Sequence, residues 1–196
     1  LGATVADDGQ WRFPGSGRVP EKFATCLLQF EDRHFHEHCG VRLPSLIRAV
    51  RQNISAGRTV SGGSTITMQV ARMSRAEKRR GYGAKLKEAM LALRIETRHS
   101  KQEILSIYAD NAPFGGNVVG LEAAAWRWFG RSPEQLTWAE SATLAVLPNA
   151  PSAIYPGKGQ NALRHKRDRL LERLLEIRAI DSTEWTLAKD EPLPSR

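Results

Sequence analysis

Apolar residues recur every three or four positions through most of this chain, which is the spacing of a helix with one buried face. Residues 23–30, FATCLLQF, have this pattern, and Pro20 ahead of them suits the start of a helix. A second helix is predicted to start at Pro44 and to stop at Gly57, and a third to cover residues 66–73. Strand-like alternation is rare in the sequence. The pattern therefore predicts a mainly α fold.

Capping boxes mark helix starts in the second half of the chain. In this motif a Ser or Thr and a Glu or Gln three residues later bond each other's backbone N–H groups. Glycine-rich loops are expected at residues 110–120 and 147–159, an amphipathic basic helix at 162–178, and a short last helix from Asp181. The capping pairs are Ser100 with Glu103, Ser132 with Gln135, and Thr137 with Glu140.

Length and charge restrict the class of protein. A chain of 196 residues suits one domain with a sizeable core. The net charge of +8 predicts attraction to polyanions. Aromatic residues make up only 7% of the chain and are not interleaved with a basic tract, so nucleic acid is less favoured than anionic lipid or pyrophosphate. No run approaches the roughly 20 apolar residues of a membrane-spanning helix.

The expected organisation is a connector, a main domain and a tail. Residues 1–19 are rich in Gly and Asp and begin without Met, so they are interpreted as a connector cut from something longer. The main domain is expected at 20–180, and a short helix with a proline-containing tail at 181–196. Cys26 and Cys39 form no CxxC pair, and both are expected to be free thiols, with a mutual bridge as the alternative in an oxidising compartment.

The stretch EDRHFHEHCG, residues 31–40, ends the first apolar helix with a carboxylate, Glu31. A carboxylate at the end of such a helix is partly desolvated, which raises its affinity for a proton and suits it to act as a general base. Glu31 is therefore the first candidate base. The alternative is a solvated helix end in which Asp32 and Arg33 form a surface ion pair.

A second candidate site follows two glycines. Ser64 and Thr65 stand just ahead of the predicted helix at 66–73, and the free N–H groups and positive dipole of a helix N-terminus can hold phosphate. The alternative is an ordinary capped helix after a loop. Residues 74–87 are basic and broken by glycines, which predicts a mobile charged loop before the helical pattern resumes at Leu86.

Lys85 and Glu88 are three residues apart and are therefore expected to be neighbours on a helix. A pair at this spacing is usually a surface ion pair. In the functional interpretation, Lys85 meets a substrate anion while Glu88 tunes it or holds a metal ion.

Five motifs occur in a fixed order: EDRHFHEHCG, GGSTITMQ, KLKE, KQEILSIY and LPNAPSAIYP. Together they resemble glycosyltransferase family 51, the peptidoglycan polymerase module of class A penicillin-binding proteins and monofunctional transglycosylases. The resemblance covers about residues 20–180, and GGSTITMQVAR with APFGG looks most like the 1C type. It implies a lysozyme-like helical large lobe with a small membrane-apposed jaw lobe, which agrees with the helical pattern.

The resemblance implies that the enzyme polymerises lipid II, transferring a glycan strand from an undecaprenyl-pyrophosphate donor with inversion at the anomeric carbon. Glu31 matches the base that deprotonates the acceptor 4-hydroxyl, and Glu88 matches the glutamate that organises the leaving diphosphate. The positions that match substrate-binding residues are Asp32, Arg33, His38, Ser64, Thr65, Gln69, Arg72 and Lys85.

Several residues depart from the family pattern. Arg72 replaces a common Lys and keeps its charge, whereas Ala84 replaces an Arg and weakens the diphosphate clamp. Ala109 and Asp110 stand in a segment where the family has other residues, which affects the positioning of the site and not the reaction class. His34, His36 and His38 form HxHxH, but alternation alone rarely makes a zinc site.

The resemblance also sets expectations for partners. No metal site is assigned beyond a role for Glu88 with Mg²⁺ or Mn²⁺, and no organic cofactor is expected. The expected partners are lipid II, the lipid-linked glycan strand, a membrane surface and moenomycin-type inhibitors, with no nucleic acid. The parent protein is expected to carry a transpeptidase domain, and the site is expected at the periplasmic face of the bacterial inner membrane.

Two alternative functions come from different classes. A lytic glycan hydrolase needs an acid that protonates the leaving sugar oxygen, often with a second carboxylate nearby, whereas Arg72 and Lys85 better suit a pyrophosphate leaving group. A basic binding module for anionic lipid or nucleic acid would bind in a salt-dependent way without chemistry.

Overall fold

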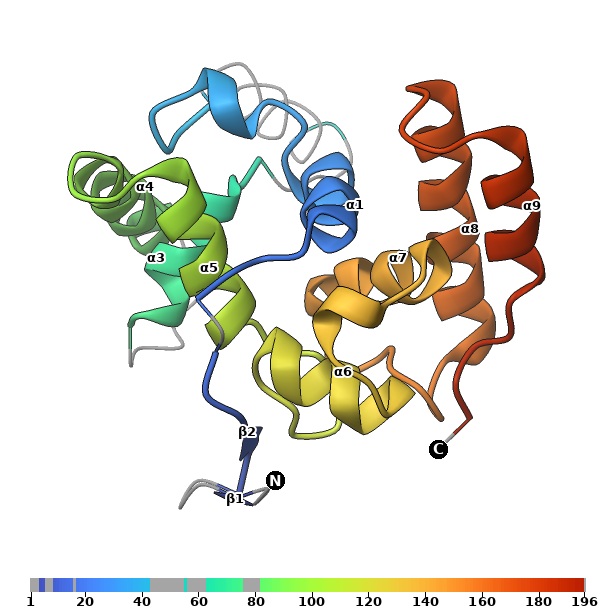
Figure 1. Ribbon diagram of the computed structural model, residues 1–196. Helices are drawn as coiled ribbons and strands as arrows, with labels where there is room; N and C mark the ends of the chain where they lie inside the picture. Colours follow the sequence, from blue (N-terminus) through green and yellow to red (C-terminus); the bar gives the residue numbers. More distant parts are fainter. Residues whose placement is uncertain are drawn as a thin grey trace. The chain divides into compact units, whose positions relative to one another are not determined.

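A computed structural model describes residues 4–5, 9–15, 17–42, 55, 63–75 and 82–195. The chain forms two compact units (Figure 1). Unit 1 combines Leu1–Arg33 with Ala109–Arg196, and unit 2 is the intervening segment His34–Tyr108. The helix expected between Pro44 and Gly57 lies, apart from Ser55, outside the described residues.

Unit 1 is built almost entirely of helices. Its short strands β1 (Thr4–Val5) and β2 (Trp11–Arg12) pair antiparallel, with Thr4 opposite Arg12 and Val5 opposite Trp11. Its α-helices are α1 (Glu21–Glu31), α6 (Leu121–Phe129), α7 (Trp138–Val146), α8 (Gln160–Glu176) and α9 (Ser182–Asp190), its 3₁₀ turns η2 (Pro133–Gln135) and η3 (Leu147–Asn149), and its strands β1 (Thr4–Val5) and β2 (Trp11–Arg12).

The core of unit 1 forms where α1 packs on α7 and α8. Phe23, Cys26 and Leu27 point inward at the spacing that the sequence predicts, and all three are fully buried. The Phe23 ring lies 6.2 Å from that of Phe114 in the loop after α5 (Lys101–Asn111). The α9 helix runs beside α8 (Figure 1). Both cysteines are free, as expected, with Cys26 buried and Cys39 exposed.

The start of α7 confirms one of the predicted capping boxes. The Thr137 hydroxyl accepts a hydrogen bond from the Glu140 N–H, and the Glu140 carboxylate accepts one from the Thr137 N–H. The prediction at Ser132 is wrong, because Pro133–Gln135 is a single 3₁₀ turn without a side-chain cap. The turn begins at Pro133, and Thr137 already caps α7 four residues later. The segment between them is therefore too short for an α-helix.

Unit 2 contains the 3₁₀ turn η1 (Phe35–Glu37), α3 (Ile66–Met73), α4 (Tyr82–Glu96) and most of α5 (Lys101–Asn111), which continues into unit 1. The α3 and α4 helices pack together. Buried Met68, Ala71 and Ala92 form their contact, with partly buried apolar residues around them. The Ser100–Glu103 cap of α5 is present as predicted.

Two expected loop boundaries differ from the structure. The charged loop expected at residues 74–87 ends earlier, because α4 already begins at Tyr82. Gly83 stands in its first turn, and a glycine costs a helix only about 1 kcal/mol. The loop expected at 110–120 starts later, since α5 continues to Asn111. The mainly α fold is confirmed, and no helix in the described part of the chain is long and apolar enough to cross a membrane.

Candidate active site

The first group of expected site residues lies at the C-terminal end of α1 in unit 1. Glu31 is the last helical residue, and one of its carboxylate oxygens, Oε1, is closed off from solvent. Asp32 is the C-cap, donates its N–H to the Leu28 carbonyl at 2.9 Å, and is 8% exposed. Arg33 is exposed. The end of α1 therefore buries Asp32 and one carboxylate oxygen of Glu31, and is not the fully solvated helix end of the alternative interpretation.

A cation from α8, which the motifs did not indicate, accompanies Glu31. The Lys166 ammonium donates to the Asn149 Oδ1 at 2.6 Å and lies 6.0 Å from the centre of the Phe30 ring. Burial lowers the pKa of Lys166, and the negative charge of Glu31 acts in the opposite direction. Glu31 and Lys166 are thus electrostatically coupled, which suits a base that must be ionised before it accepts a proton.

The second group lies on α3, α4 and the segment before α3, all in unit 2. The Lys85 ammonium hydrogen-bonds the Ser64 hydroxyl, and its Nζ lies 3.7 Å from the Glu88 Oε2. Glu88 is 8% exposed, whereas Lys85 keeps 39% of its side chain accessible. The structure therefore brings together Ser64, Lys85 and Glu88, of which the first and last are 24 positions apart in the sequence. It also confirms that Lys85 and Glu88 are neighbours.

The charge of Lys85 is not fully compensated by its neighbours. Burial lowers the pKa of Lys85, the Glu88 carboxylate partly offsets this shift, and the positive charge of Arg72 adds to it. Arg72 is exposed at the last turn of α3. A cation that is disfavoured by burial and by a second cation gains most from an incoming anion, so this cluster suits a phosphate group.

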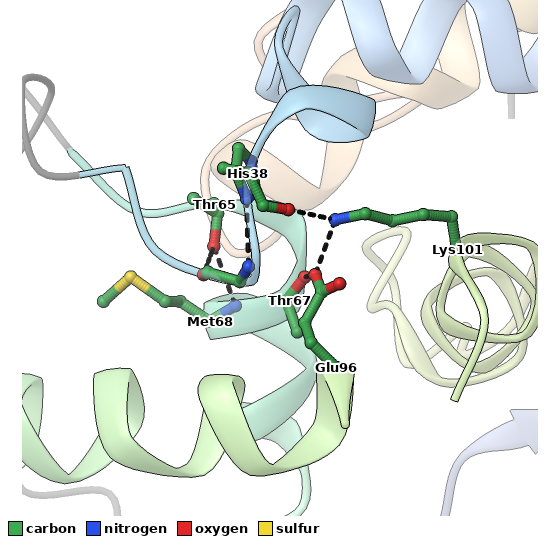
Figure 2. Close-up of polar contacts among 7 residues, drawn as sticks. His38, Thr65, Thr67, Met68, Glu96 and Lys101 are labelled. Atoms are coloured by element: carbon green, nitrogen blue, oxygen red, sulfur yellow. Dashed lines mark hydrogen bonds and ion pairs between the residues drawn. The ribbon is translucent and has the colours of Figure 1, made fainter. Parts of the chain in front are cut away.

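Thr65 and His38 hold the backbone at Gly40 and at the start of α3 (Figure 2). The Thr65 hydroxyl donates to the Gly40 carbonyl at 2.5 Å and accepts from the Met68 N–H at 3.1 Å, which makes Thr65 the N-cap of α3. The His38 Nδ1 accepts the Gly40 N–H at 3.1 Å. Thr65 is 3% exposed, so its hydroxyl positions the start of α3 through contacts within the protein.

A partly buried ion pair connects the same region to α4 and α5, and the sequence did not indicate it as a site feature (Figure 2). Lys101 donates to the Glu96 Oε1 at 2.7 Å and to the His38 carbonyl at 2.6 Å, and its ammonium lies 4.3 Å from the centre of the Phe35 ring. The Thr67 hydroxyl donates to the same Glu96 oxygen at 2.6 Å. These contacts tie the EDRHFHEHCG segment to α3.

Comparison with known proteins decides between the alternatives left open by the motifs. A family model described as Transglycosylase matches residues 4–175, which is most of the chain. The chain belongs to the transglycosylase family. This membership confirms the resemblance seen in the motifs and the enzyme class, a peptidoglycan glycosyltransferase.

Similar proteins include two penicillin-binding proteins. Penicillin-binding protein 1C of Escherichia coli is 39% identical over 188 residues, which is 95% of this chain and 24% of that protein. Penicillin-binding protein 1A of Pseudomonas aeruginosa is 38% identical over 175 residues, 89% of this chain and 21% of that protein. The transglycosylase chain thus spans about a quarter of the length of these relatives. A crystal structure of penicillin-binding protein 1A from Haemophilus influenzae matches 96% of this chain and 20% of that one, with 20% identity and a TM-score of 0.47.

The remaining expected site residues of the transglycosylase are distributed over both units. Gln69 is buried on α3, and the Ala84 carbonyl accepts a 3.4 Å hydrogen bond from Arg75. Ala109 is buried and Asp110 exposed in the last turn of α5. Glu31, Asp32 and Arg33 belong to unit 1, whereas the substrate-binding positions from His38 to Lys85 and the second glutamate, Glu88, belong to unit 2.

The histidines of the HxHxH stretch and Glu88 are the residues that the sequence offers for metal ligation. The His34 Nδ1 contacts the Glu37 carboxylate at 2.7 Å. Among the described residues no group of three or more His, Cys, Asp or Glu side chains is placed to hold a metal ion. Mg²⁺ is commonly bound by one or two carboxylates together with substrate phosphates, and Glu88 beside Lys85 offers one such carboxylate.

Proposed function

We propose that this domain polymerises lipid II, transferring the glycan strand of an undecaprenyl-pyrophosphate donor to the 4-hydroxyl of the acceptor sugar with inversion. The observation that carries the proposal is the cluster of Ser64, Lys85 and Glu88 with the charge of Arg72 in electrostatic reach. A diphosphate leaving group gains negative charge as the donor bond breaks. A side chain such as Lys85, whose charged form is disfavoured in the free enzyme by burial and by a second cation, stabilises that developing negative charge most strongly.

In this proposal Glu31 is the general base. Its carboxylate takes the proton of the acceptor hydroxyl while that oxygen forms a bond to the donor C1, and the bond between C1 and the diphosphate oxygen breaks with its electron pair. A base is effective when it is ionised and partly shielded from water. The closed-off Oε1 and the nearby Lys166 charge provide both conditions at the end of α1.

Glu88 acts on the leaving group through Lys85. Its carboxylate holds the Lys85 ammonium in its charged form and orients it toward the diphosphate. A divalent cation, Mg²⁺ or Mn²⁺, would be held by Glu88 together with the substrate phosphates and would supply further positive charge. Thr65, His38, Gln69 and Asp32 then serve as positioning residues or substrate contacts, as the family resemblance implies.

The proposed partners are lipids, and α4 carries a surface suited to them. Its Leu86 and Met90 side chains are 65% and 64% exposed, and Leu93 on the same side of the helix is also exposed. An exposed apolar face beside basic residues is typical of helices that rest on a membrane. This face of α4 supports contact of the domain with a membrane surface. As the family resemblance implies, we propose that the domain acts at the periplasmic face of the inner membrane, as part of a longer protein with a transpeptidase domain. We also expect inhibition by moenomycin-type phosphoglycolipids.

The test is polymerisation of labelled lipid II in mild detergent with Mg²⁺, followed by gel separation and muramidase digestion. Glu31→Gln keeps the shape of the side chain but removes its basicity, so turnover should fall by about 10² or more with donor binding nearly intact. Glu88→Gln should cost less turnover and should weaken donor binding as well.

Full polymerase activity of the Glu31→Gln variant would refute the mechanism. Release of disaccharides from finished glycan without polymer would instead identify a hydrolase. Salt-sensitive binding to anionic vesicles without any product would identify a binding module.

A further inference from the structure

Arg167, near the middle of α8, is the most deeply buried charged residue in the described part of the chain. It is 2% exposed, whereas the buried carboxylates of Asp32, Glu88 and Glu140 belong to residues that are 6–8% exposed. A guanidinium removed from water destabilises a fold unless hydrogen bonds and a counter-charge satisfy it. The proposed reaction does not use Arg167, so its burial indicates a further role within unit 1.

The Arg167 guanidinium binds the end of α9 and the residues after it, a segment (residues 189–194) that we call the α9 tail. Its Nη1 donates to the Glu191 carbonyl at 2.6 Å, and its Nη2 donates to the Lys189 carbonyl at 3.1 Å. The last carbonyls of a helix have no partner within the helix, and a cation there is favourable. The Asp168 carboxylate accepts from the Arg167 Nε at 2.9 Å and supplies the counter-charge.

Two further side chains bind the α9 tail. The Gln160 Nε2, on the first residue of α8, donates to the Pro194 carbonyl at 3.0 Å. The Thr137 hydroxyl at the start of α7 donates to the Glu191 Oε1 at 3.0 Å. Gln160 and Arg167 are seven residues apart, which is about 10 Å along a helix. The tail therefore holds α8 at two separate points, and two points of attachment restrict both the rotation and the tilt of a helix.

The residue before Arg167 is Lys166, whose charge is coupled to Glu31 at the end of α1. Successive residues of an α-helix point about 100° apart, so fixing the direction of Arg167 also fixes the direction of Lys166. The Lys166 ammonium donates to the Asn149 Oδ1 at 2.6 Å. A lysine ammonium sits on a flexible stem of four carbons, so this contact depends on how α8 is held.

We infer that Arg167 is a positioning residue for the general base. By binding the α9 tail it fixes α8, and α8 in turn holds the Lys166 ammonium near Glu31. Loss of the tail contacts should let α8 rotate and draw Lys166 away from Asn149 and Glu31. The expected effect on turnover rests on the proposed function, whereas the contact between Lys166 and Asn149 can be followed without any substrate.

The side-chain amide signal of Asn149 in the ¹⁵N-labelled domain reports on the hydrogen bond from Lys166. Lys166→Met removes this donor and gives the reference position of the signal. Arg167→Lys keeps the charge but cannot bond both tail carbonyls with one planar fork, so the signal should move at least about halfway to that reference. Asp168→Asn is a milder substitution at a residue whose side chain is 22% exposed, and it should move the signal in the same direction by a smaller amount.

Glu172→Gln is the matched control. The Glu172 Oε1 lies 3.7 Å from the Lys189 Nζ, so this ion pair also joins α8 to α9. Its side chains are 54% and 40% exposed, and exposed pairs contribute little to stability. Glu172→Gln should therefore leave the Asn149 signal in place and change kcat by less than about twofold. A purely structural role of Arg167 would lower the melting temperature of Arg167→Lys without moving the Asn149 signal of the folded protein.

Turnover of lipid II tests whether Arg167 acts through Lys166. Lys166→Met and Arg167→Lys should each lower kcat by about tenfold at a temperature where both variants are folded. The double variant should be within about twofold of Lys166→Met alone, because the second substitution finds no contact left to remove.

Two results would overturn the inference: an Asn149 signal at the wild-type position in folded Arg167→Lys and Asp168→Asn, or losses in kcat that multiply in the double variant. Absence of polymer from the wild type would refute the proposed function, and the Asn149 signal would then decide on the positioning of Lys166 by itself.

Discussion

The Lys85 ammonium is the group whose charge most directly connects the structure to a measurable pH dependence. Its pKa is lowered by burial, raised by Glu88 and lowered by Arg72. If Lys85 binds the diphosphate in its protonated form, kcat/KM should fall as the pH rises through the pKa of Lys85 in the free enzyme. The two neighbours should then move this descending limb in opposite directions.

Glu88→Gln removes the charge that raises the Lys85 pKa, so the descending limb should move to lower pH. Arg72→Ala removes a charge that lowers this pKa, so the limb should move to higher pH even though overall turnover decreases. Arg94→Gln removes an exposed charge from the same helix as Lys85 and should not move the limb. The measurement is kcat/KM for lipid II between neutral and alkaline pH, and shifts in the same direction for both variants would contradict the assignment.

At the residue scale, local contacts were predictable and tertiary contacts were not. The contact between Lys85 and Glu88 follows from helix geometry, because residues three apart on a helix are neighbours. The coupling of Lys166 to Glu31 joins residues 135 positions apart through the packing of α8 on α1, and no sequence pattern encodes it. The Lys101–Glu96 pair is similar, since its role appears only through its bond to the His38 carbonyl.

At the scale of elements, caps and apolar spacing located most of the described helices with small errors at their ends, but did not predict α6. The α3 helix has the predicted bounds, because Thr65 caps it and its apolar face is continuous. The wrong element at Ser132 has a physical reason: a sequence that fits a capping box forms one only if a helix follows. The early start of α4 reflects a first turn that tolerates Gly83.

The two capping positions that the sequence predicted before α7 provide a test of this distinction. Thr137→Ala removes a cap whose hydroxyl also donates to the Glu191 carboxylate at 3.0 Å, so it should lower the free energy of unfolding by about 1–2 kcal/mol. Ser132→Ala removes no side-chain cap and should change it by less than about 0.5 kcal/mol. Thr137→Ser keeps the hydroxyl and is the control.

Urea unfolding followed by tryptophan fluorescence measures both substitutions, because Trp138 begins α7. Equal destabilisation by Thr137→Ala and Ser132→Ala would show that the Thr137 hydrogen bonds do not determine the stability of α7.

At the scale of the molecule, the chain inserts one unit into another. Unit 1 combines the first 33 residues with everything after residue 108, and unit 2 is continuous. The expected boundaries at residues 19 and 180 follow composition and motif limits and stay a prediction. The division into units depends on contacts between α1 and the C-terminal helices, which lie more than 100 residues apart in sequence.

The insertion leads to a prediction about cooperativity. All five tryptophans, Trp11, Trp126, Trp128, Trp138 and Trp185, belong to unit 1, so their fluorescence reports the unfolding of that unit. Ile180 in unit 1 and Ile66 in unit 2 are both buried, and Ile→Val at either position should cost about 1 kcal/mol through the same loss of one methyl group.

If the units open separately, Ile180→Val should shift the fluorescence transition and lower hydrogen-exchange protection in α7 and α8 by about fivefold, with α3 and α4 unaffected. Ile66→Val should lower protection in α3 and α4 and leave the fluorescence midpoint in place. Unit 2 is one continuous segment, so it can lose its packing while α1 stays packed on α7 and α8. Unit 1 consists of two segments, and its unfolding requires α1 to separate from α7 and α8. Hydrogen exchange read by mass spectrometry tests this, and a uniform loss of protection from either substitution would mean that the chain opens as one cooperative unit.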